Sequence, residues 1–456
     1  MKIRKIKYHQ HPILGDLELD LVNPNTGLPY NTIVLAGENG TGKTTILSSL
    51  NTFLCLNSFE HFERIDYEVD NHQYAVVSTG RDHDNQMGFH NRIDLQTNTT
   101  TNIRRNRNND TQGIAQDLLD IRHYGSVYSK ARADFSVRKI TGTTSLEVDK
   151  NSYDDDGQED FSSLKQLIID LQADDSGRWQ ELTEADPAHH ADYDAFLQTA
   201  KMYRFRTAFN NFFETIKYKK VETSDGEKKV LFTKHNKDIT IDVLSTGEKQ
   251  IVYRGIYLLR NVGKLDGAAV MVDEPELSMH PKWQKRILKY FKDLFTADGG
   301  TQKVQLFFAT HSEYVLGEAL NDPTNTLVVV LKDNNGTIEK KEVTAPLLLP
   351  TLMASEVNYV TFDVASVDYH IALYGAIQTK YSRHSISSCD QFIETQCAPY
   401  YNAAIHGVVT NYGGTTYNTL PTKIRNHIDH PDNPYTFSDE ELKISIKLMR
   451  DIYLNI

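Results

Sequence analysis

Eight residues near the N-terminus have the types and the spacing of a phosphate-binding loop. They run from Gly37 to Thr44 and read G-E-N-G-T-G-K-T, which fits the pattern G-x-x-x-x-G-K-T. Glycines let backbone N–H groups turn inward around a phosphate, Lys43 supplies a positive charge for the outer phosphates, and the Thr44 hydroxyl can ligate Mg²⁺. The sequence therefore predicts a nucleoside triphosphate site with contacts from Asn39, Gly40, Thr41, Gly42, Lys43, Thr44 and Thr45.

Such a loop functions only between a strand and a helix, and the flanking residues predict both. Residues 32–36 form a short apolar run typical of a buried strand, and residues 45–50 continue with helical periodicity. A helix that begins at Gly42 aims its positive end at the same phosphate. The alternative is an ordinary glycine-rich turn before a helix, and the lysine and the hydroxyl argue against it.

Three side chains with catalytic potential stand at the ends of two other apolar runs. Asp273 and Glu274 end the run 268–274, and His311 lies at the end of the run 304–312; both runs are typical of parallel strands buried on both faces. Asp273 is placed to hold Mg²⁺ through water, and Glu274 to orient the attacking water or accept its proton. The structural alternatives are carboxylates that only support a strand end and a histidine that only packs there.

A fourth stretch opens a predicted long helix over 246–263. It reads LSTGEKQ at 244–250. The hydroxyls of Ser245 and Thr246, the N–H of Gly247 and the helix dipole suit a terminal phosphate.

The four stretches, taken in chain order, resemble those of one family. They are GENGTGKT at 37–44, LSTGEKQ at 244–250, VMVDEPELSMHP at 270–281 and FFATHSEY at 307–314. The order is similar to that of ABC-type ATPases, in the branch that includes the SMC, RecF and overcoming-lysogenization ATPases. The resemblance implies ATP and Mg²⁺ as cofactors and a contact of His311 with the γ-phosphate.

The same resemblance implies a head-to-tail dimer. In it Ser245, Gly247 and Glu248 contact the nucleotide held by the other copy, so that ATP joins the two copies and hydrolysis releases them. The family also has a glutamine that touches Mg²⁺, and Gln73 and Gln86 remain equal candidates for it.

Composition narrows the class of protein. A chain of 456 residues with 39% hydrophobic and 24% charged residues fits a soluble globular protein of two or three domains. No apolar run approaches the ~20 residues of a membrane span, and no signal peptide is recognised. Cys55, Cys389 and Cys397 lack C-x-x-C spacing, so we expect neither zinc nor disulfides. We expect a cytoplasmic protein without a membrane partner, and the net charge of -12 disfavours one that coats nucleic acid.

We expect an α/β P-loop NTPase fold of the ABC type, with a partly helical insertion and an all-α C-terminal domain. The expected regions are an N-terminal lobe with the P-loop (1–83), the insertion (84–220), a second lobe with the signature, Walker B and histidine switch (221–345) and the helical domain (346–456).

Local expectations are a polar loop at 84–112 whose Arg104-Arg105-x-Arg107 cluster is a solvated face, a helix at 114–123, a strand at 127–129 near the nucleotide, and an exposed acidic stretch at 149–160.

The C-terminal region contains Arg-Asn-x-x-x-His, formed by Arg425, Asn426 and His430. It is similar to the R-x4-6-H motif of HEPN ribonucleases, and the architecture resembles the PrrC and RloC anticodon nucleases of phage defence. The resemblance implies metal-independent RNA cleavage, with His430 in the proton role, Arg425 in the charge role and Asn426 in positioning. The alternative is a helix end where His430 meets the helix dipole and Arg425 pairs with Asp429 at i+4.

Three functions therefore compete. The first is an ATP-gated ribonuclease that attacks tRNA when phage infection is sensed, with an inhibitor protein among its candidate partners. The second is an ATPase subunit that resembles the Septu-type PtuA and regulates a separate HNH nuclease partner. The third is a RecF- or SMC-like DNA repair ATPase.

Overall fold

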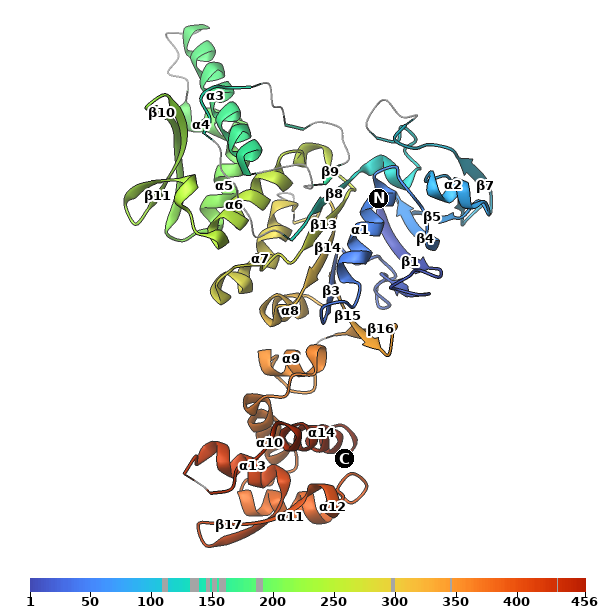
Figure 1. Cartoon of the computed structure of the whole chain (residues 1–456), viewed down its shortest axis with the longest axis vertical. Helices are drawn as coiled ribbons and strands as arrows, with labels where there is room; N and C mark the ends of the chain where they lie inside the picture. Colours follow the sequence, from blue (N-terminus) through green and yellow to red (C-terminus); the bar gives the residue numbers. More distant parts are fainter. Residues whose placement is uncertain are drawn as a thin grey trace. The chain divides into compact units, whose positions relative to one another are not determined.

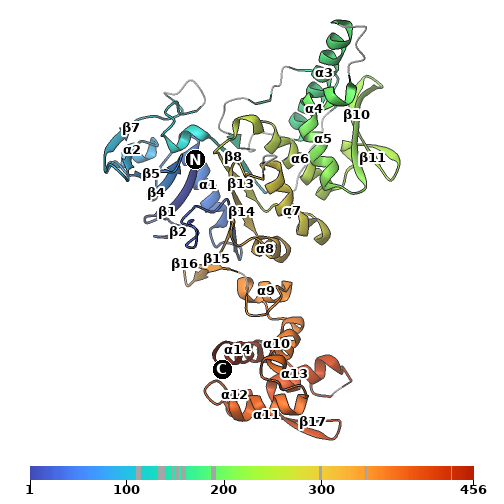
Figure 2. The ribbon, with the colours of Figure 1, turned by 180° about the vertical axis from the view of Figure 1, so that it is seen from behind.

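The computed structural model describes residues 1–108, 114–131, 139–144, 148–149, 154–155, 161–185, 192–296, 300–344, 347–432 and 434–456. The chain divides into two compact units, Met1–Glu342 and Val343–Ile456. Figures 1 and 2 show both. Most of the acidic stretch expected at 149–160 lies outside the described residues. None of the described helices is long and apolar enough to cross a membrane.

The first unit is organised around a seven-stranded sheet with the order β16-β15-β3-β14-β13-β8-β9 (Figure 1). Its strands are β3 (Thr32–Gly37), β8 (Ser126–Ser129), β9 (Asp154–Asp155), β13 (Ala269–Asp273), β14 (Gln305–Thr310), β15 (Thr326–Asn334) and β16 (Thr337–Val343). Strands β15, β3, β14, β13 and β8 run parallel. The register pairs Leu35 with Ala309 and Ala309 with Asp273, so the carboxyl ends of three buried strands meet at one edge.

Side-chain alternation gives this sheet two buried faces, as expected for apolar parallel strands. One face contributes Leu35, Met271 and Phe307 to a core shared with helix α1 (Lys43–Leu54) and with a second sheet. The opposite face carries Phe308, whose ring lies 5.9 Å from that of Phe291 in α7 (Pro281–Leu294). The sheet is therefore held rigidly between layers, and its carboxyl edge can position side chains.

The second sheet is antiparallel and has the order β2-β1-β4-β5-β6-β7. Its strands are β1 (Lys2–Tyr8), β2 (Glu18–Asp20), β4 (Phe62–Val69), β5 (His72–Val77), β6 (His90–Asp94) and β7 (Thr100–Ile103). The prediction of a polar loop at 84–112 is wrong over much of its length, because α2 (Asp82–Gln86), β6 and β7 form there. The polar residues of β6 do not indicate a strand by themselves, and β6 forms by pairing with β5.

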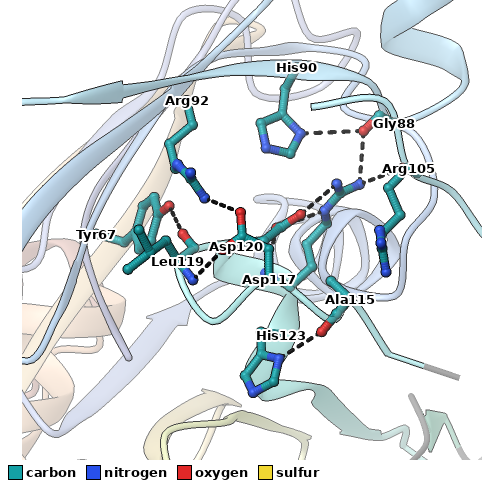
Figure 3. A network of polar contacts seen from close by, with 11 residues as sticks. Tyr67, Gly88, His90, Arg92, Arg105, Ala115, Asp117, Leu119, Asp120 and His123 are labelled. Carbon is teal, nitrogen blue, oxygen red and sulfur yellow. Dashed lines mark hydrogen bonds and ion pairs between the residues drawn. The ribbon is translucent and has the colours of Figure 1, made fainter. Parts of the chain in front are cut away.

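The helix expected at 114–123 is also wrong, and a polar network explains why. Residues 114–120 are irregular, and only a 3₁₀ turn at Ile121–Tyr124 follows. The fully buried Arg122 guanidinium donates to Asp120 at 2.9 Å and to the carbonyl oxygens of Gly88 and Arg105 at 2.9 and 3.0 Å. Figure 3 shows Asp120 at the centre, with Tyr67 and Arg92 reaching the same loop. Side-chain bonds thus replace helical ones in this segment.

The network also fixes the far end of α1. The Arg122 guanidinium lies over the Phe53 ring at 5.4 Å from its centroid, and Arg107 Nε donates to the Cys55 carbonyl at 2.8 Å. Arg107 therefore braces the P-loop helix. Arg104 is exposed, as expected of a solvated face, with its Nε donating to Asn102 Oδ1 at 3.0 Å.

Helices and a small sheet complete the first unit. The helices are α3 (Phe161–Ala185), α4 (Tyr193–Thr199), α5 (Tyr203–Phe212), α6 (Thr246–Leu259), α7 and α8 (Glu313–Leu320), and the sheet contains β10 (Ile216–Ser224), β11 (Glu227–Lys234) and β12 (Lys237–Thr240). The longest of these helices is α3, which runs without a break over 25 residues.

The second unit is mostly helical around its own core. It contains α9 (Ala354–Phe362), α10 (Val367–Lys380), α11 (Ile386–Gln396), α12 (Ala403–His406), β17 (Gly407–Tyr412), β18 (Thr415–Thr419), α13 (Leu420–Asp429) and α14 (Asp439–Asn455). The all-α expectation is wrong at 407–419, where β17 and β18 pair as an antiparallel hairpin. Gly413 and Gly414 take φ of 58° and 78°, which suits the tight turn between two strands that contain mostly β-branched and aromatic residues.

Candidate functional site

Glycines shape the P-loop at the end of β3. Gly42 caps α1 with φ 88°, in the left-handed region where glycine is favoured. A Cβ on Gly37 would stand 2.3 Å from the Leu331 carbonyl oxygen, and one on Gly42 would stand 2.4 Å from a Leu14 methyl. Gly37 therefore requires glycine for its close approach to backbone, and Gly42 requires it for its positive φ, which agrees with the motif.

Lys43 lies inside the loop and is only 5% exposed. Its ammonium donates to the carbonyl oxygens of Gly37 and Glu38 at 2.9 and 2.8 Å. Burial lowers the pKa of Lys43 to about 8, although the charges of Asp273 and Glu274 oppose the shift. The lysine is thus a preplaced cation whose charge depends on pH in an accessible range.

Two hard oxygen ligands meet beside the lysine. The Thr44 hydroxyl donates to Asp273 Oδ2 at 2.9 Å, and the Tyr128 hydroxyl approaches the same oxygen at 3.3 Å. Burial raises the pKa of Asp273, and the negative charge of Glu274 adds to the shift. One carboxylate and one hydroxyl beside a phosphate site fit Mg²⁺, which typically takes one or two carboxylates plus phosphate oxygens. Across the described residues, no cluster of three or more His, Cys, Asp or Glu side chains offers another cation site.

Glu274 and His311 converge at the same edge from neighbouring strands. Glu274 follows β13 with φ 44°, and its N–H donates to the Ala309 carbonyl at 2.8 Å. His311 Nε2 lies 3.8 Å from Glu274 Oε1. Burial lowers the pKa of His311, and the Lys43 charge lowers it further. The imidazole is therefore neutral at pH 7, and its side chain stands near both the base candidate and the P-loop.

Arg254 is a buried residue of this site that the sequence motifs do not indicate. It lies on α6, is 1% exposed, and donates to the carbonyl oxygens of Asp273 and Glu274 at 2.8 and 3.2 Å. Its Nε donates to Gln250 Oε1 at 3.2 Å on the same helix. Arg254 thereby joins α6, the helix opened by LSTGEKQ, to the strand end that carries both carboxylates. A lone arginine inside an apolar helix face was the only available signal.

The signature stretch forms the N-terminus of α6 through a capping box. The Ser245 hydroxyl accepts from the Glu248 N–H, and the Glu248 carboxylate accepts from the Ser245 N–H at 2.8 Å. Glu248 also pairs with Lys234 at 2.6 Å. Its carboxylate is therefore engaged within its own chain. A Cβ on Gly247 would stand 2.6 Å from the Ser278 carbonyl oxygen, so this glycine lets α6 approach the loop after β13.

The remaining predicted contacts occupy the loop or lie elsewhere. Asn39 and Gly40 are exposed, Thr45 is half-buried, and the Thr41 hydroxyl donates to the Glu38 carbonyl at 2.9 Å. Gln73 lies in β5 of the antiparallel sheet, and Gln86 ends α2. The strand expected at 127–129 forms as β8. It pairs with β13 and carries Tyr128.

A protein-family model described as "AAA domain, putative AbiEii toxin, Type IV TA system" matches residues 33–317. This chain belongs to that AAA-domain family. The α/β P-loop fold expected from the sequence is confirmed by this match and by the sheet that carries the motif.

Solved structures of SMC heads are similar to the chain of this AAA-domain protein. The SMC head domain from Thermotoga maritima has 12% identity and a TM-score of 0.41, with 76% of this chain and 100% of that chain covered. An SMC head bound to the C-winged helix domain of ScpA has 11% identity and a TM-score of 0.41, with 76% of this chain and 99% of that chain covered. An SMC head with an extended coiled coil bound to the C-terminal domain of ScpA, derived from Pyrococcus furiosus, has 11% identity and a TM-score of 0.37, with 75% of this chain and 96% of that chain covered.

The second unit of the AAA-domain protein holds the Arg-Asn-x-x-x-His residues at the end of α13. Arg425 pairs with Asp429 at 2.5 Å and donates to Asn426 Oδ1 at 3.0 Å. Asn426 is 1% exposed. His430 follows the helix, is exposed, and has its ring 4.9 Å from that of Tyr412 on β17. The i+4 pair of the structural alternative thus forms, while His430 stays accessible at the helix end.

Proposed function

We propose that this chain binds ATP with Mg²⁺ and hydrolyses it at the edge where β3, β13 and β14 end. One observation carries the proposal, which is the convergence of Lys43, Thr44, Asp273, Glu274 and His311 from segments far apart in the sequence. A cation, two hard oxygen ligands, a general base and a polar residue near the γ-phosphate are what phosphoryl transfer to water requires.

Each residue has a separate task in this proposal. Lys43 neutralises the outer phosphates, and the N–H groups of residues 39–45 cradle them. Thr44 and Asp273 would hold Mg²⁺, which supplies positive charge to the phosphate oxygens. Glu274 orients a water molecule and accepts its proton, and the neutral His311 contacts the γ-phosphate.

The proposal includes a nucleotide-dependent pair of copies. Ser245 and Gly247 stand at the N-terminus of a 14-residue helix, α6, whose dipole favours a phosphate supplied by a second copy. Binding of ATP then favours the paired state and hydrolysis releases it, which makes the ATPase a population switch.

Purified full-length protein tests this function directly. We expect Mg²⁺-dependent phosphate release from ATP, loss of that release in Lys43→Ala, and no loss in Lys237→Ala, which removes an exposed lysine of β12. Light scattering measures the mass with and without ATP in the Glu274→Gln variant. ATP turnover that Lys43→Ala leaves unchanged would exclude the site, and a mass unaffected by ATP would exclude the pairing.

We further propose that the ATPase controls a ribonuclease site at Arg425, Asn426 and His430 in anti-phage defence. Support comes from the exposed His430 at the end of α13 and from the family description, which names a putative toxin. Total tRNA with ATP is the substrate in the test. We expect cleavage by the wild type, none by Arg425→Ala/His430→Ala, and undiminished cleavage by the exposed control pair His384→Ala/Lys443→Ala.

The second candidate output is regulation of a separate HNH nuclease, with the second unit as its docking surface. Residues 346–456 contain 11 Asp and Glu against 7 Lys and Arg, a balance that suits a basic protein partner better than RNA. If the wild type with ATP leaves tRNA intact, the ribonuclease is excluded and this output is favoured. A RecF- or SMC-like role in DNA repair would appear instead as ATP turnover stimulated by DNA.

A further inference from the structure

Glu276 links the two strand ends that carry Glu274 and His311. It lies in the loop after β13, two residues beyond Glu274, and its side chain reaches the end of the neighbouring strand β14. There Oε1 accepts two hydrogen bonds, from the Thr310 hydroxyl at 2.7 Å and from the His311 backbone N–H at 2.8 Å. The Glu276 carboxylate, three residues beyond Asp273, therefore holds the backbone of the histidine directly.

The second oxygen of the Glu276 carboxylate is placed at a cost in free energy. Glu276 Oε2 is buried and has no hydrogen-bond partner among the described residues. Burial raises the pKa of Glu276, while the bonds from Thr310 and His311 oppose the shift. A buried carboxyl oxygen without a partner is destabilising, so such a group calls for an explanation.

The bonds around Glu276 define where His311 stands. Three hydrogen bonds join the segment 274–276 to the segment 309–311. Two are the bonds that Glu276 accepts from Thr310 and His311, and the third runs from the Glu274 N–H to the Ala309 carbonyl at 2.8 Å. Only the contact at His311 fixes the backbone from which the imidazole extends. The ring lies 3.8 Å from the Glu274 carboxylate, so a small shift of that backbone would change the distance between the two groups.

We propose that Glu276 is a positioning residue for ATP hydrolysis, which sets the place of His311 against Glu274 and the P-loop by accepting the His311 N–H. The inference rests on the ATPase function proposed above. Glu276 needs no contact with nucleotide in this role. Its effect belongs to the chemical step, since it orients a group that acts on the γ-phosphate rather than one that binds the nucleotide.

Three variants separate positioning from charge and from general loosening of the loop. Glu276→Ala removes the acceptor of both bonds. Glu276→Gln keeps an oxygen acceptor of the same size and removes the charge. Gln284→Ala is the matched control, because Gln284 Oε1 accepts from the Ser312 hydroxyl at 2.6 Å and so joins α7 to the end of the same strand without touching His311.

The experiment measures kcat and KM for ATP, the dissociation constant of ATP and the thermal unfolding midpoint for the full-length wild type and each variant. We expect kcat to fall about 10- to 100-fold in Glu276→Ala, as for a misplacement of a catalytic group by about 1 Å. KM and the dissociation constant should change less than about threefold. Glu276→Gln should keep kcat within about threefold of wild type, and Gln284→Ala should too.

Each other outcome overturns the inference. Unchanged kcat in Glu276→Ala, or an equal fall in Gln284→Ala, would show that the His311 contact has no special role. A Glu276→Gln variant as slow as Glu276→Ala would assign Glu276 a charge or proton role instead. A wild type that binds ATP without turnover would overturn the proposed function and this inference together, whereas an active wild type isolates the failure to Glu276.

Discussion

The hydroxyl of Thr44 donates to the carboxylate of Asp273 across 2.9 Å, although 229 positions separate the two residues in the sequence. The contact arises because β14 pairs with β3 on one side and with β13 on the other, so the strand ends that carry the P-loop and the Asp-Glu pair lie two strands apart at one edge. One helix start and one strand end thus present a hydroxyl and a carboxylate to the same position.

The Glu274→Gln substitution should separate ATP binding from hydrolysis. Glutamine keeps the size of the side chain but accepts no proton, so we expect kcat to fall about 100-fold or more while the dissociation constant of ATP changes little. Single-turnover hydrolysis and equilibrium binding measure the two quantities. Glu181→Gln on the exposed end of α3 is the control and should match wild type. Retained turnover in Glu274→Gln would remove Glu274 from the base role.

The affinity for ATP should weaken at alkaline pH. Burial lowers the pKa of Lys43 to about 8, so the ammonium that attracts the phosphates loses its proton as the pH rises through that value. By linkage we expect binding about tenfold weaker at pH 9 than at pH 7. Titration calorimetry across this range gives the dissociation constants. The Lys43→Arg variant keeps its charge throughout, so its affinity should vary less with pH. An equal slope for both proteins would contradict this origin of the effect.

The Gly247→Ala substitution should destabilise the first unit. A Cβ there would stand 2.6 Å from the Ser278 carbonyl oxygen and 3.5 Å from the Trp283 ring, which forces α6 away from the loop after β13. We expect a loss of about 1–3 kcal/mol in the free energy of unfolding, the usual cost of overpacking. The control is Gly317→Ala in α8, where nothing lies within 4 Å and about 0.5–1 kcal/mol should be gained. Denaturant unfolding distinguishes the two signs.

The Asp120→Ala substitution should cost more than removal of the whole Asp120–Arg122 pair. Both side chains are buried, so a lone Arg122 would keep an uncompensated charge, and we expect a loss of about 3–5 kcal/mol. The Asp120→Ala/Arg122→Met double variant should unfold at higher denaturant concentration than the single variant. A double variant that is less stable than Asp120→Ala would contradict this account.

The same ion pair predicts a direction for acid unfolding. Burial by itself raises the pKa of Asp120, but the charge and hydrogen bonds of Arg122 outweigh burial and hold the pKa below its ordinary value. A depressed folded-state pKa contributes stability that is present above the unfolded-state value of about 3.9 and is lost as the pH falls below it. Unfolding curves between pH 7 and pH 3 should therefore show a smaller acid dependence for the double variant than for wild type.

The sequence predicted those parts of the fold in which local pattern and function coincide. The strand before the P-loop and the helix after it follow from an apolar run, glycines and helical periodicity within about 20 residues. The runs ending in Asp273 and His311 were recognisable for the same reason, since buried parallel strands are continuously apolar. The segment 84–103 and the hairpin 407–419 were not, because these polar strands, at or next to a sheet edge, gain their structure from pairing partners rather than from their own composition.

The sequence by itself determined which chemistry the chain can offer, because the types and spacing of the P-loop residues, of Asp273 and Glu274, and of His311 are local properties. Only the tertiary structure decided what stands beside them. Sheet order brings Thr44 to Asp273, α6 delivers Arg254 to the strand end, and Glu276 reaches across to the His311 backbone. Hydrogen bonds of about 3 Å depend on strand register and helix packing, which no local pattern specifies.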